Sequence, residues 1–391
     1  MKLQVGVFFG GKATEHEVSV ISAIQAMENM DESKYEIIPI YVTKEERFYF
    51  SPLLRKIDEY KNLPALLSKV TEVSFEKSKD LRKIHVMKSG VKVFSKNLAS
   101  IDLIFPILHG NKGENGGIQG MFEMWGLPYV GSNVLASAIG MDKDIAKIVA
   151  SHIGVPVIDF VAFHKYDYYS RPDQIMESIM EKLSFPMIVK PASGGSSIGI
   201  EIAKDEQSLK SSIEQVFSFD VKLIVENKVE NLREVNCSVL GDISEAKASV
   251  IEEPSTADEI LSFQDKYMQD STKGMSSAKR QIPARLSDEM KNTIEEYSIR
   301  IFKKYGCSGV VRIDYIIDTK KDKVYFNEIN TIPGSLSFYL WKHNGIEYPE
   351  LLDRLIKIAI KVHQRMNEFN YSFENNLFST NALNMKGKLK G

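Results

Sequence analysis

Two short apolar runs, each ending in glycine, constrain the fold of this chain more than any other feature. Leu3–Phe9 leads into Gly10-Gly11, and Ile101–Leu108 leads into the glycine-rich stretch His109–Gly120. Such a run is typical of a buried strand, and glycine permits the tight turn before a helix. A further strand is predicted at Tyr35–Val42. This alternation of strands and helices predicts an N-terminal α/β domain with a doubly wound sheet.

The first helix is predicted from a capping box. Thr14 stands three residues before Glu17, a pattern that starts a helix, which we expect to run to about Met27. Glu15 lies in the same turn, where a carboxylate often does no more than interact favourably with the helix dipole. Because Thr14 and Glu17 account for the cap, Glu15 is also available to hold a substrate ammonium group. The pattern leaves both roles open.

The length of 391 residues and a change of character near Met141 indicate more than one domain. We expect an α/β domain at 1–140, a central subdomain at 141–222, a C-terminal subdomain at 223–373 and a polar tail at 374–391. Residues 43–100 predict no definite element. The other predicted elements are helices at Asp142–His152 and Ser287–Tyr305, strands at Phe185–Val189, Leu223–Val225 and Glu234–Leu240, and a hairpin of Val310–Ile317 with Val324–Ile329.

The hairpin carries the sharpest chemical signal. Because side chains alternate faces along a strand, Arg312 and Asp314 share one face, and Glu328 and Asn330 share one face of the partner. Mg²⁺ prefers such oxygen ligands, with phosphate oxygens completing its shell. The turn Thr331–Gly334 follows directly and would reverse the chain at the site. This favours a metal site over the alternative, a solvated face with surface ion pairs.

Lys190 and the loop after it predict a nucleotide site. A strand carries Lys190 to its end, and Pro191–Gly199 then offers backbone N–H groups with nothing bulky to block a phosphate. This is not a P-loop, because no Gly-Lys-Ser/Thr opens a helix. By itself the loop is better explained as plain flexible chain. Combined with Lys190 and the acidic hairpin, it indicates phosphate binding.

The segment Phe263–Ser277 is polar and has no period. Irregular chain of that length in a compact protein is typical of a functional lid.

Composition excludes several classes of protein. Apolar residues make up 43% and charged residues 26%, and the formal net charge is −2, so neither a nucleic-acid-binding nor a membrane surface is indicated. No apolar stretch approaches the roughly 18 residues of a membrane span, and the first apolar run does not resemble a signal peptide. Cys237 and Cys307 lack metal-ligand spacing, so reduced thiols in a cytoplasmic protein are expected.

Five segments resemble the signatures of the D-alanine–D-alanine ligases and follow one another in the family's order. Together they cover nearly the whole chain, and several independent motifs at proper spacing are far more specific than any single one. The segments are Phe9–Ser19, Leu108–Gly120, Tyr129–Lys143, Val189–Gly199 and Arg312–Gly334.

The resemblance implies an ATP-grasp fold behind the N-terminal α/β domain and a two-step reaction. ATP would phosphorylate the carboxylate of one D-alanine, and the amine of a second would attack the acyl phosphate to give D-alanyl-D-alanine for peptidoglycan synthesis. D-alanine and ATP are therefore the expected small-molecule partners, and two Mg²⁺ ions, or Mn²⁺, the expected metals. A homodimer is possible.

The matched positions take their expected roles from the family. Glu15 and Ser196 would hold the first ammonium group, with His109 near that substrate. Lys143, Lys190 and Ser197 would contact the ATP phosphates, while Glu226, Lys228 and Val229 would line the adenine pocket and Glu234 would bind the ribose. Asp314, Glu328 and Asn330 would hold the metals, and Arg312 would stabilise the tetrahedral intermediate. Lys266 and Tyr267 would lie on the lid that excludes water.

The segment after Gly334 departs from the family pattern. It is about four residues shorter than the pattern before Leu340-Trp341. In the family this stretch supplies a glycine N–H and a serine hydroxyl to the carboxylate of the second substrate. Gly334 is retained, and Ser335 or Ser337 would have to replace the serine. We expect D-alanine at both positions, with another small D-amino acid such as D-serine as the alternative acceptor.

Two other classes of protein are less compatible with the motifs. An ATP-grasp enzyme for other substrates, such as a carboxylase, would not need the Glu15 motif or the Lys266-Tyr267 pair. A nucleotide-binding regulator without catalysis would be expected to lose the metal carboxylates or Arg312. All of these residues are present, which favours the ligase.

Overall fold

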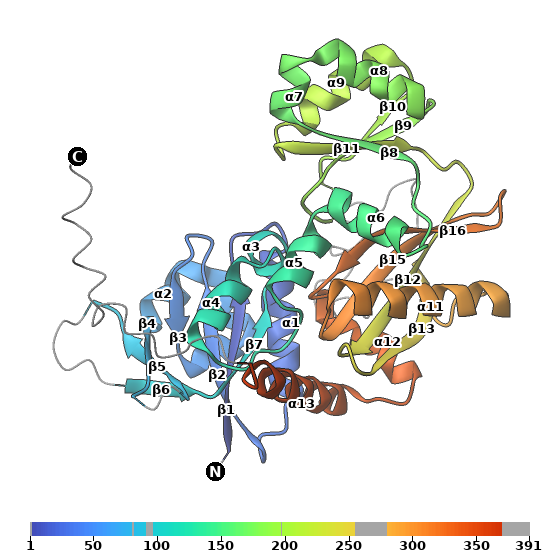
Figure 1. Ribbon diagram of the computed structural model, residues 1–391. Helices are drawn as coiled ribbons and strands as arrows, with labels where there is room; N and C mark the ends of the chain where they lie inside the picture. The colour runs from blue at the N-terminus through green and yellow to red at the C-terminus, as the bar shows by residue number, and fades with distance from the viewer. Residues whose placement is uncertain (1, 80–81, 91–96, 197, 255–279, 370–391) are drawn as a thin grey trace, which may run out of the picture.

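The computed structural model describes residues 2–79, 82–90, 97–196, 198–254 and 280–369. These residues form three β-sheets, each accompanied by helices (Figure 1). No helix among them is long and apolar enough to cross a membrane. Cys237 and Cys307 are free and buried, and burial raises the pKa of each thiol to about 12. Both thiols therefore stay protonated at neutral pH.

The first sheet has a parallel centre. β1 (Leu3–Gly10) lies between β2 (Tyr35–Val42) and β7 (Leu103–Ile107) and runs parallel to both, which confirms these predicted strands. Helix α1 (His16–Asn29) connects β1 to β2. The order of the whole sheet is β6-β5-β4-β3-β2-β1-β7.

Residues 43–100, for which the sequence predicted no definite element, extend this sheet with antiparallel strands. Short strands with partly exposed faces show a weaker apolar pattern than buried parallel strands, so they are harder to recognise. The strands are β3 (Phe48–Phe50), β4 (Thr71–Lys77), β5 (Ile84–Lys88) and β6 (Asn97–Ile101), with η1 (Pro52–Arg55), η2 (Ile57–Asn62) and α2 (Leu63–Lys69) between β3 and β4.

The predicted capping box at the start of α1 is wrong. The helix begins at His16, its N-cap residue is Glu15, and no side chain caps it. Thr14 Oγ1 instead donates to Glu15 Oε2 at 2.6 Å, and Glu17 pairs with Lys44. Thr14 lies one residue before the N-cap position, and its hydroxyl is used by Glu15, so it does not accept from a backbone N–H of the first turn. The Glu15 side chain is nevertheless free of a capping role, as expected.

Four helices lead from the first sheet to the second. The last of them, α6, confirms the predicted helix near Asp142–His152, because the Asp142 carboxylate caps it by accepting from two backbone N–H groups. The helices are α3 (Asn111–Glu114), α4 (Gly117–Trp125), α5 (Val134–Met141) and α6 (Lys143–His152).

The second sheet is antiparallel, in the order β10-β9-β11-β8, and carries its helices at the far end of the molecule (Figure 1). The predicted strand at Phe185–Val189 is two residues out of position, because β9 continues through Lys190 to Pro191. The elements are β8 (Phe160–His164), α7 (Lys165–Ser170), α8 (Pro172–Lys182), β9 (Met187–Pro191), β10 (Glu201–Ala203), α9 (Glu206–Val216) and β11 (Lys222–Asn227).

The third sheet, in the order β14-β13-β12-β15-β16, is also antiparallel and confirms the predicted hairpin. Helix α11 packs against β12 and β13. The elements are β12 (Leu232–Gly241), β13 (Ala246–Pro254), β14 (Arg280–Gln281), α11 (Asp288–Tyr305), β15 (Gly309–Asp318), β16 (Lys323–Asn330), η4 (Gly334–Ser337) and α12 (Phe338–His343).

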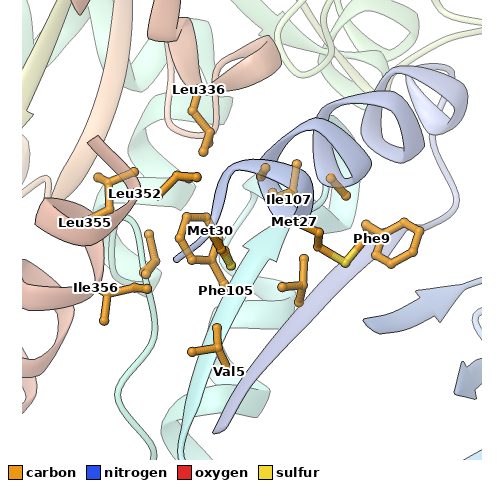
Figure 2. Close-up of a cluster of buried hydrophobic side chains, with 14 of the residues drawn as sticks. Val5, Phe9, Met27, Met30, Phe105, Ile107, Leu336, Leu352, Leu355 and Ile356 are labelled. Atoms are coloured by element: carbon orange, nitrogen blue, oxygen red, sulfur yellow. The ribbon is translucent and has the colours of Figure 1, made fainter. Parts of the chain in front are cut away.

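The last described helix, α13 (Tyr348–Met366), packs against the N-terminal domain and also contacts β15 of the third sheet. Figure 2 shows its side chains in one apolar cluster with residues of β1, α1 and β7. The cluster includes Val5, Phe9, Met27, Met30, Phe105, Ile107, Leu336, Leu352, Leu355 and Ile356, all of them buried. The two ends of the described chain therefore share one core.

Candidate active site

The predicted polar residues of the hairpin lie together on one face. Across β15 and β16, Arg312 is opposite Asn330 and Asp314 is opposite Glu328, and opposed residues point to the same side. The Arg312 guanidinium donates to both Asp314 carboxylate oxygens at 2.7 Å. Asn330 Nδ2 lies 3.2 Å from Asp314 Oδ2. The shared face expected from the alternation is confirmed.

The oxygen atoms of this face fit a hard divalent cation. In the part of the chain that the structure describes, no three His, Cys, Asp or Glu side chains form a group able to hold a metal. The predicted set instead combines two carboxylates with one amide, which suits Mg²⁺ only if a substrate supplies further oxygens. Arg312 limits metal binding by this set, because it donates to both carboxylate oxygens of Asp314, and a metal ion would have to share those oxygens with it.

A basic cluster lies where the second sheet meets the hairpin. Lys190 Nζ contacts Glu226 Oε1 at 2.5 Å and Asn327 Oδ1 at 3.3 Å. Lys143, at the start of α6, donates to the Gly194 carbonyl at 2.6 Å and lies 3.5 Å from Glu328 Oε2. The predicted phosphate lysines therefore lie beside both the glycine loop and the predicted metal carboxylates.

Sequence reasoning missed a third lysine in this cluster. Lys147 Nζ lies 2.9 Å from Glu226 Oε2, and its side chain is completely buried. Burial alone would raise the pKa of Glu226, but Lys147 and Lys190 outweigh it and hold that pKa at about 2. The spacing from Lys143, four residues along one helix, was the signal that points to Lys147.

Glu15 connects the N-terminal domain to the loop after β9. The Ser196 hydroxyl donates to Glu15 Oε1, and both side chains are buried. A Cβ atom at Gly110 would lie 2.5 Å from Glu15 Oε2, so any residue other than glycine would clash with this carboxylate. The two residues predicted to share one task are thus in direct contact, although 181 positions separate them.

His109 and Glu114 join the glycine-rich loop to the chain just beyond the hairpin. His109 Nδ1 donates to the Ile332 carbonyl at 2.8 Å, and Glu114 accepts from the backbone N–H groups of Ile332 (2.9 Å) and Gly110 (2.7 Å). Burial lowers the pKa of His109 to about 4 and raises the pKa of Glu114 to about 7. Sequence reasoning missed Glu114, because its partners are distant in sequence.

The structure distinguishes the two serines of the shortened segment. Ser335 Oγ donates to Gln25 Oε1 at 3.0 Å, so this side chain points toward α1. Ser337 Oγ is buried and has no hydrogen-bond partner among the described residues. Ser335, Leu336 and Ser337 all have left-handed backbones, with φ of 47°, 53° and 50°. Such strain in non-glycine residues is typical of functional sites.

Tyr339, two residues after Ser337, anchors the far end of this segment. Its hydroxyl donates to Glu252 Oε1 at 2.8 Å, and the Arg280 guanidinium lies 4.3 Å from the ring centroid. The short segment is therefore fastened to α1 at one end and to β13 at the other.

The predicted adenine and ribose residues run from β11 of the second sheet, through the connection after it, to β12 of the third sheet. Glu226 is the penultimate residue of β11 and lies inside the basic cluster, and the Lys228 backbone N–H donates to the Pro186 carbonyl at 3.0 Å. Val229 follows in the connection to β12. Glu234 shares a face with Asp314, because Asn236, two residues further along β12, is opposite Asp314. Ser197, Lys266 and Tyr267, and with them the predicted lid Phe263–Ser277, lie outside the described residues.

Two family models match the chain. The model described as "D-ala D-ala ligase N-terminus" matches residues 4–132, and the one described as "D-ala D-ala ligase C-terminus" matches residues 149–357. A D-alanine–D-alanine ligase of Caldicellulosiruptor bescii is 41% identical over 379 residues, which are 95% of this chain and 99% of the relative. The chain belongs to the D-alanine–D-alanine ligase family.

Solved structures of the family agree with this assignment. The VanG D-Ala:D-Ser ligase of Enterococcus faecalis is 32% identical, with a TM-score of 0.76 over 92% of this chain and 100% of its own. The D-alanine–D-alanine ligase of Bacillus anthracis complexed with ATP is 27% identical, with a TM-score of 0.64 over 93% of this chain and 99% of its own. The ligase family, the enzyme class and the ATP-grasp fold predicted from the sequence are confirmed.

Proposed function

We propose that this family member joins two D-alanine molecules into D-alanyl-D-alanine, with ADP and phosphate as the other products. The observation that carries the proposal is the contact between Glu15 and Ser196. It brings a buried carboxylate of the N-terminal domain to the phosphate-type loop, so that an amino acid held by its ammonium group would present its carboxylate to a nucleotide. The cytoplasm, where ATP is available, is the expected compartment.

In the first step the γ-phosphoryl group of ATP moves to a carboxylate oxygen of the first D-alanine, and the bond to the β-phosphate breaks. Lys143, Lys190 and Ser197 would bind the phosphates, because this transfer needs positioning and charge neutralisation more than covalent help. Glu226, Lys228, Val229 and Glu234 would hold the nucleoside. Glu15 and Ser196 would hold the first ammonium group, with His109 fixing the loop beside it.

In the second step the free amine of the acceptor attacks the acyl carbon, phosphate leaves with the bonding electron pair, and the amine loses a proton. Arg312 would stabilise the negative charge that develops on the carbonyl oxygen, since a fixed guanidinium is effective at this point. Lys266 and Tyr267 would belong to the lid that keeps water from the acyl phosphate.

Asp314, Glu328 and Asn330 would hold the two Mg²⁺ ions, or Mn²⁺ in their place. Bound there, the ions would neutralise charge on the phosphate oxygens. The support for this set is its oxygen chemistry and the short reach from Glu328 to Lys143, one of the proposed phosphate ligands.

Gly334 and Ser337 would bind the carboxylate of the acceptor. The support for Ser337 over Ser335 is that its buried hydroxyl has no partner in the described chain, whereas the Ser335 hydroxyl is engaged by Gln25. A buried hydroxyl without a partner is costly, and a carboxylate ligand would remove that cost.

D-serine is the second candidate acceptor. The similarity to a ligase named for D-Ala and D-Ser favours it, and so does the shortened acceptor segment. The 41% identity to a D-alanine–D-alanine ligase favours D-alanine.

Phosphate release tests both candidates. The enzyme is incubated with ATP, Mg²⁺ and D-alanine alone, and dipeptide formation is then measured with D-alanine, D-serine and glycine in competition. We expect phosphate release with D-alanine alone and D-alanyl-D-alanine as the main dipeptide. If D-alanine is a poor acceptor beside D-serine or glycine, the D-alanyl-D-alanine assignment is wrong, while the ligase family stands.

A further inference from the structure

Glu226 is shared by two lysines that differ in their surroundings. Lys147 contacts Oε2 at 2.9 Å and Lys190 contacts Oε1 at 2.5 Å, so each ammonium group has its own carboxylate oxygen. The three side chains are between 0 and 5% exposed. One carboxylate with two ammonium groups leaves an excess positive charge in a region closed to water. Such an excess is unfavourable unless a further anion joins the cluster.

The two lysines are not equivalent. Lys190 also contacts Asn327 on the hairpin strand that carries Glu328, so it lies on the side of the proposed phosphate and metal groups. Lys147 lies one helical turn after Lys143 on α6, and within the described chain the Glu226 carboxylate is the polar group that its Nζ contacts. Its Nζ also lies 5.8 Å from the centroid of the Phe160 ring.

We propose that Lys147 is a positioning residue that keeps Glu226 paired when Lys190 turns from it to the phosphates of ATP. The proposal rests on the ATP site of the proposed function and adds a residue to it. Without Lys147, Lys190 would be the sole counterion of Glu226. Phosphate binding would then leave a buried carboxylate unpaired, which is strongly unfavourable. With Lys147 present, Lys190 exchanges one anion for another and Glu226 stays ionised and in place.

The test is a double-mutant cycle of Lys147→Met and Glu226→Gln, read as the affinity for a non-hydrolysable ATP analogue with Mg²⁺ by calorimetry. Methionine keeps the length of the side chain without its charge. We expect Lys147→Met to weaken binding on the order of tenfold to a hundredfold in the wild-type background. In the Glu226→Gln background, where no carboxylate can be left unpaired, the same change should cost less than about threefold. Equal losses in both backgrounds, or no loss in the wild type, would overturn the proposal.

Steady-state kinetics give a second readout. Lys147→Met should raise the KM for ATP while kcat and the KM for D-alanine stay within about twofold. A purely structural lysine would instead lower the thermal stability of the free enzyme and leave the ratio of the KM values unchanged. If Lys147→Met does not fold, Lys147→Gln replaces it in the same cycle, with the same expected and contradicting results.

Lys182 provides a matched control. It is exposed, yet its Nζ lies 5.5 Å from the centroid of the same Phe160 ring. Lys182→Met should leave nucleotide affinity unchanged, and a loss there would mean that Lys147 acts through the ring. The two proposals fail separately. Nucleotide binding without phosphate release on D-alanine would contradict the proposed function alone, and a cycle without coupling would contradict only the role of Lys147.

Discussion

At the scale of single residues, burial decides what the site groups can do. Ser335 and Ser337 have the same side chain two positions apart, yet one hydroxyl is engaged and the other has no partner in the part of the chain that the structure describes. His109 and Glu114 contact the same residue, Ile332, yet burial moves their pKa values in opposite directions. Residue type sets the chemistry, and the local environment selects the role.

The acceptor serine is the first prediction at this scale. Ser337→Ala should raise the KM for the acceptor D-alanine on the order of tenfold, because a hydroxyl bonded to a carboxylate contributes about 1.5–3 kcal/mol. Ser335→Ala should instead cost about 1 kcal/mol of stability through the lost contact with Gln25. Steady-state kinetics and denaturant unfolding measure the two effects. The opposite pattern would assign the carboxylate to Ser335.

The second prediction at this scale concerns how the free energy of unfolding depends on pH through His109. Burial lowers its pKa from 6.5 to about 4, so the folded state favours the neutral ring. Its contribution to stability is fully present above pH 6.5 and is lost as the pH falls toward 4, by roughly 3 kcal/mol in all. His109→Asn, which keeps a donor for the Ile332 carbonyl, should remove this dependence from the free energy of unfolding.

The titration of Glu114 also changes the free energy of unfolding with pH, so the experiment needs a control for it. Its raised pKa gives stability that is present below pH 4.5 and is lost as the pH rises through about 7, which is the opposite sign in an overlapping window. The comparison is therefore the difference between wild type and His109→Asn at each pH, repeated in a Glu114→Gln background. Parallel pH curves for the two proteins would contradict the role of His109.

At the scale of elements, the hairpin of β15 and β16 is the most informative unit, because strand alternation and register together fix which side chains meet. Asp314→Asn and Glu328→Gln should each lower phosphate release roughly a hundredfold or more, because each removes a charge proposed to hold a metal at the transferring phosphate. Far-UV circular dichroism should be unchanged. Chelation of Mg²⁺ should abolish turnover, and added Mg²⁺ should restore it.

Asp322, in the exposed turn of the same hairpin, provides the control. Asp322→Asn removes an equal charge from the same element and should leave turnover near that of the wild type. Near-normal phosphate release by either Asp314→Asn or Glu328→Gln would show that the metal assignment is wrong.

At the scale of the whole molecule, we expect α13 to couple the unfolding of the N-terminal domain to that of the third sheet, because it packs against both. Leu352 lies in the core that β1, α1 and β7 form in the N-terminal domain. Leu352→Ala should lower the free energy of unfolding by about 2–5 kcal/mol. The loss should be seen equally by Trp125, in α4, and by Trp341, in α12, when each is the only tryptophan of a single-tryptophan variant. A Trp125 transition that Leu352→Ala leaves unchanged would contradict this coupling.

The sequence by itself determined the buried strands, the hairpin with its four polar residues, and the family. These features depend on local periods and on motifs within short segments, which no distant contact needs to complete. Its predicted domain boundaries at 140/141 and 222/223 stay predictions. Its capping box was wrong, because the helix begins at His16 and Glu15, not Thr14, is the N-cap residue.

Only the tertiary structure decided which groups meet across long separations. Glu114 binds Ile332 over 218 positions, and Lys147 on α6 meets a carboxylate of β11. Among the described residues the Ser337 hydroxyl has no partner, while Ser335 contacts α1. Burial and ion pairing depend on how whole elements pack, so they cannot be predicted from any single segment of the sequence. The sequence therefore identified the family, but it could not show that Glu114, Lys147 and Ser337 belong to the surroundings of the site.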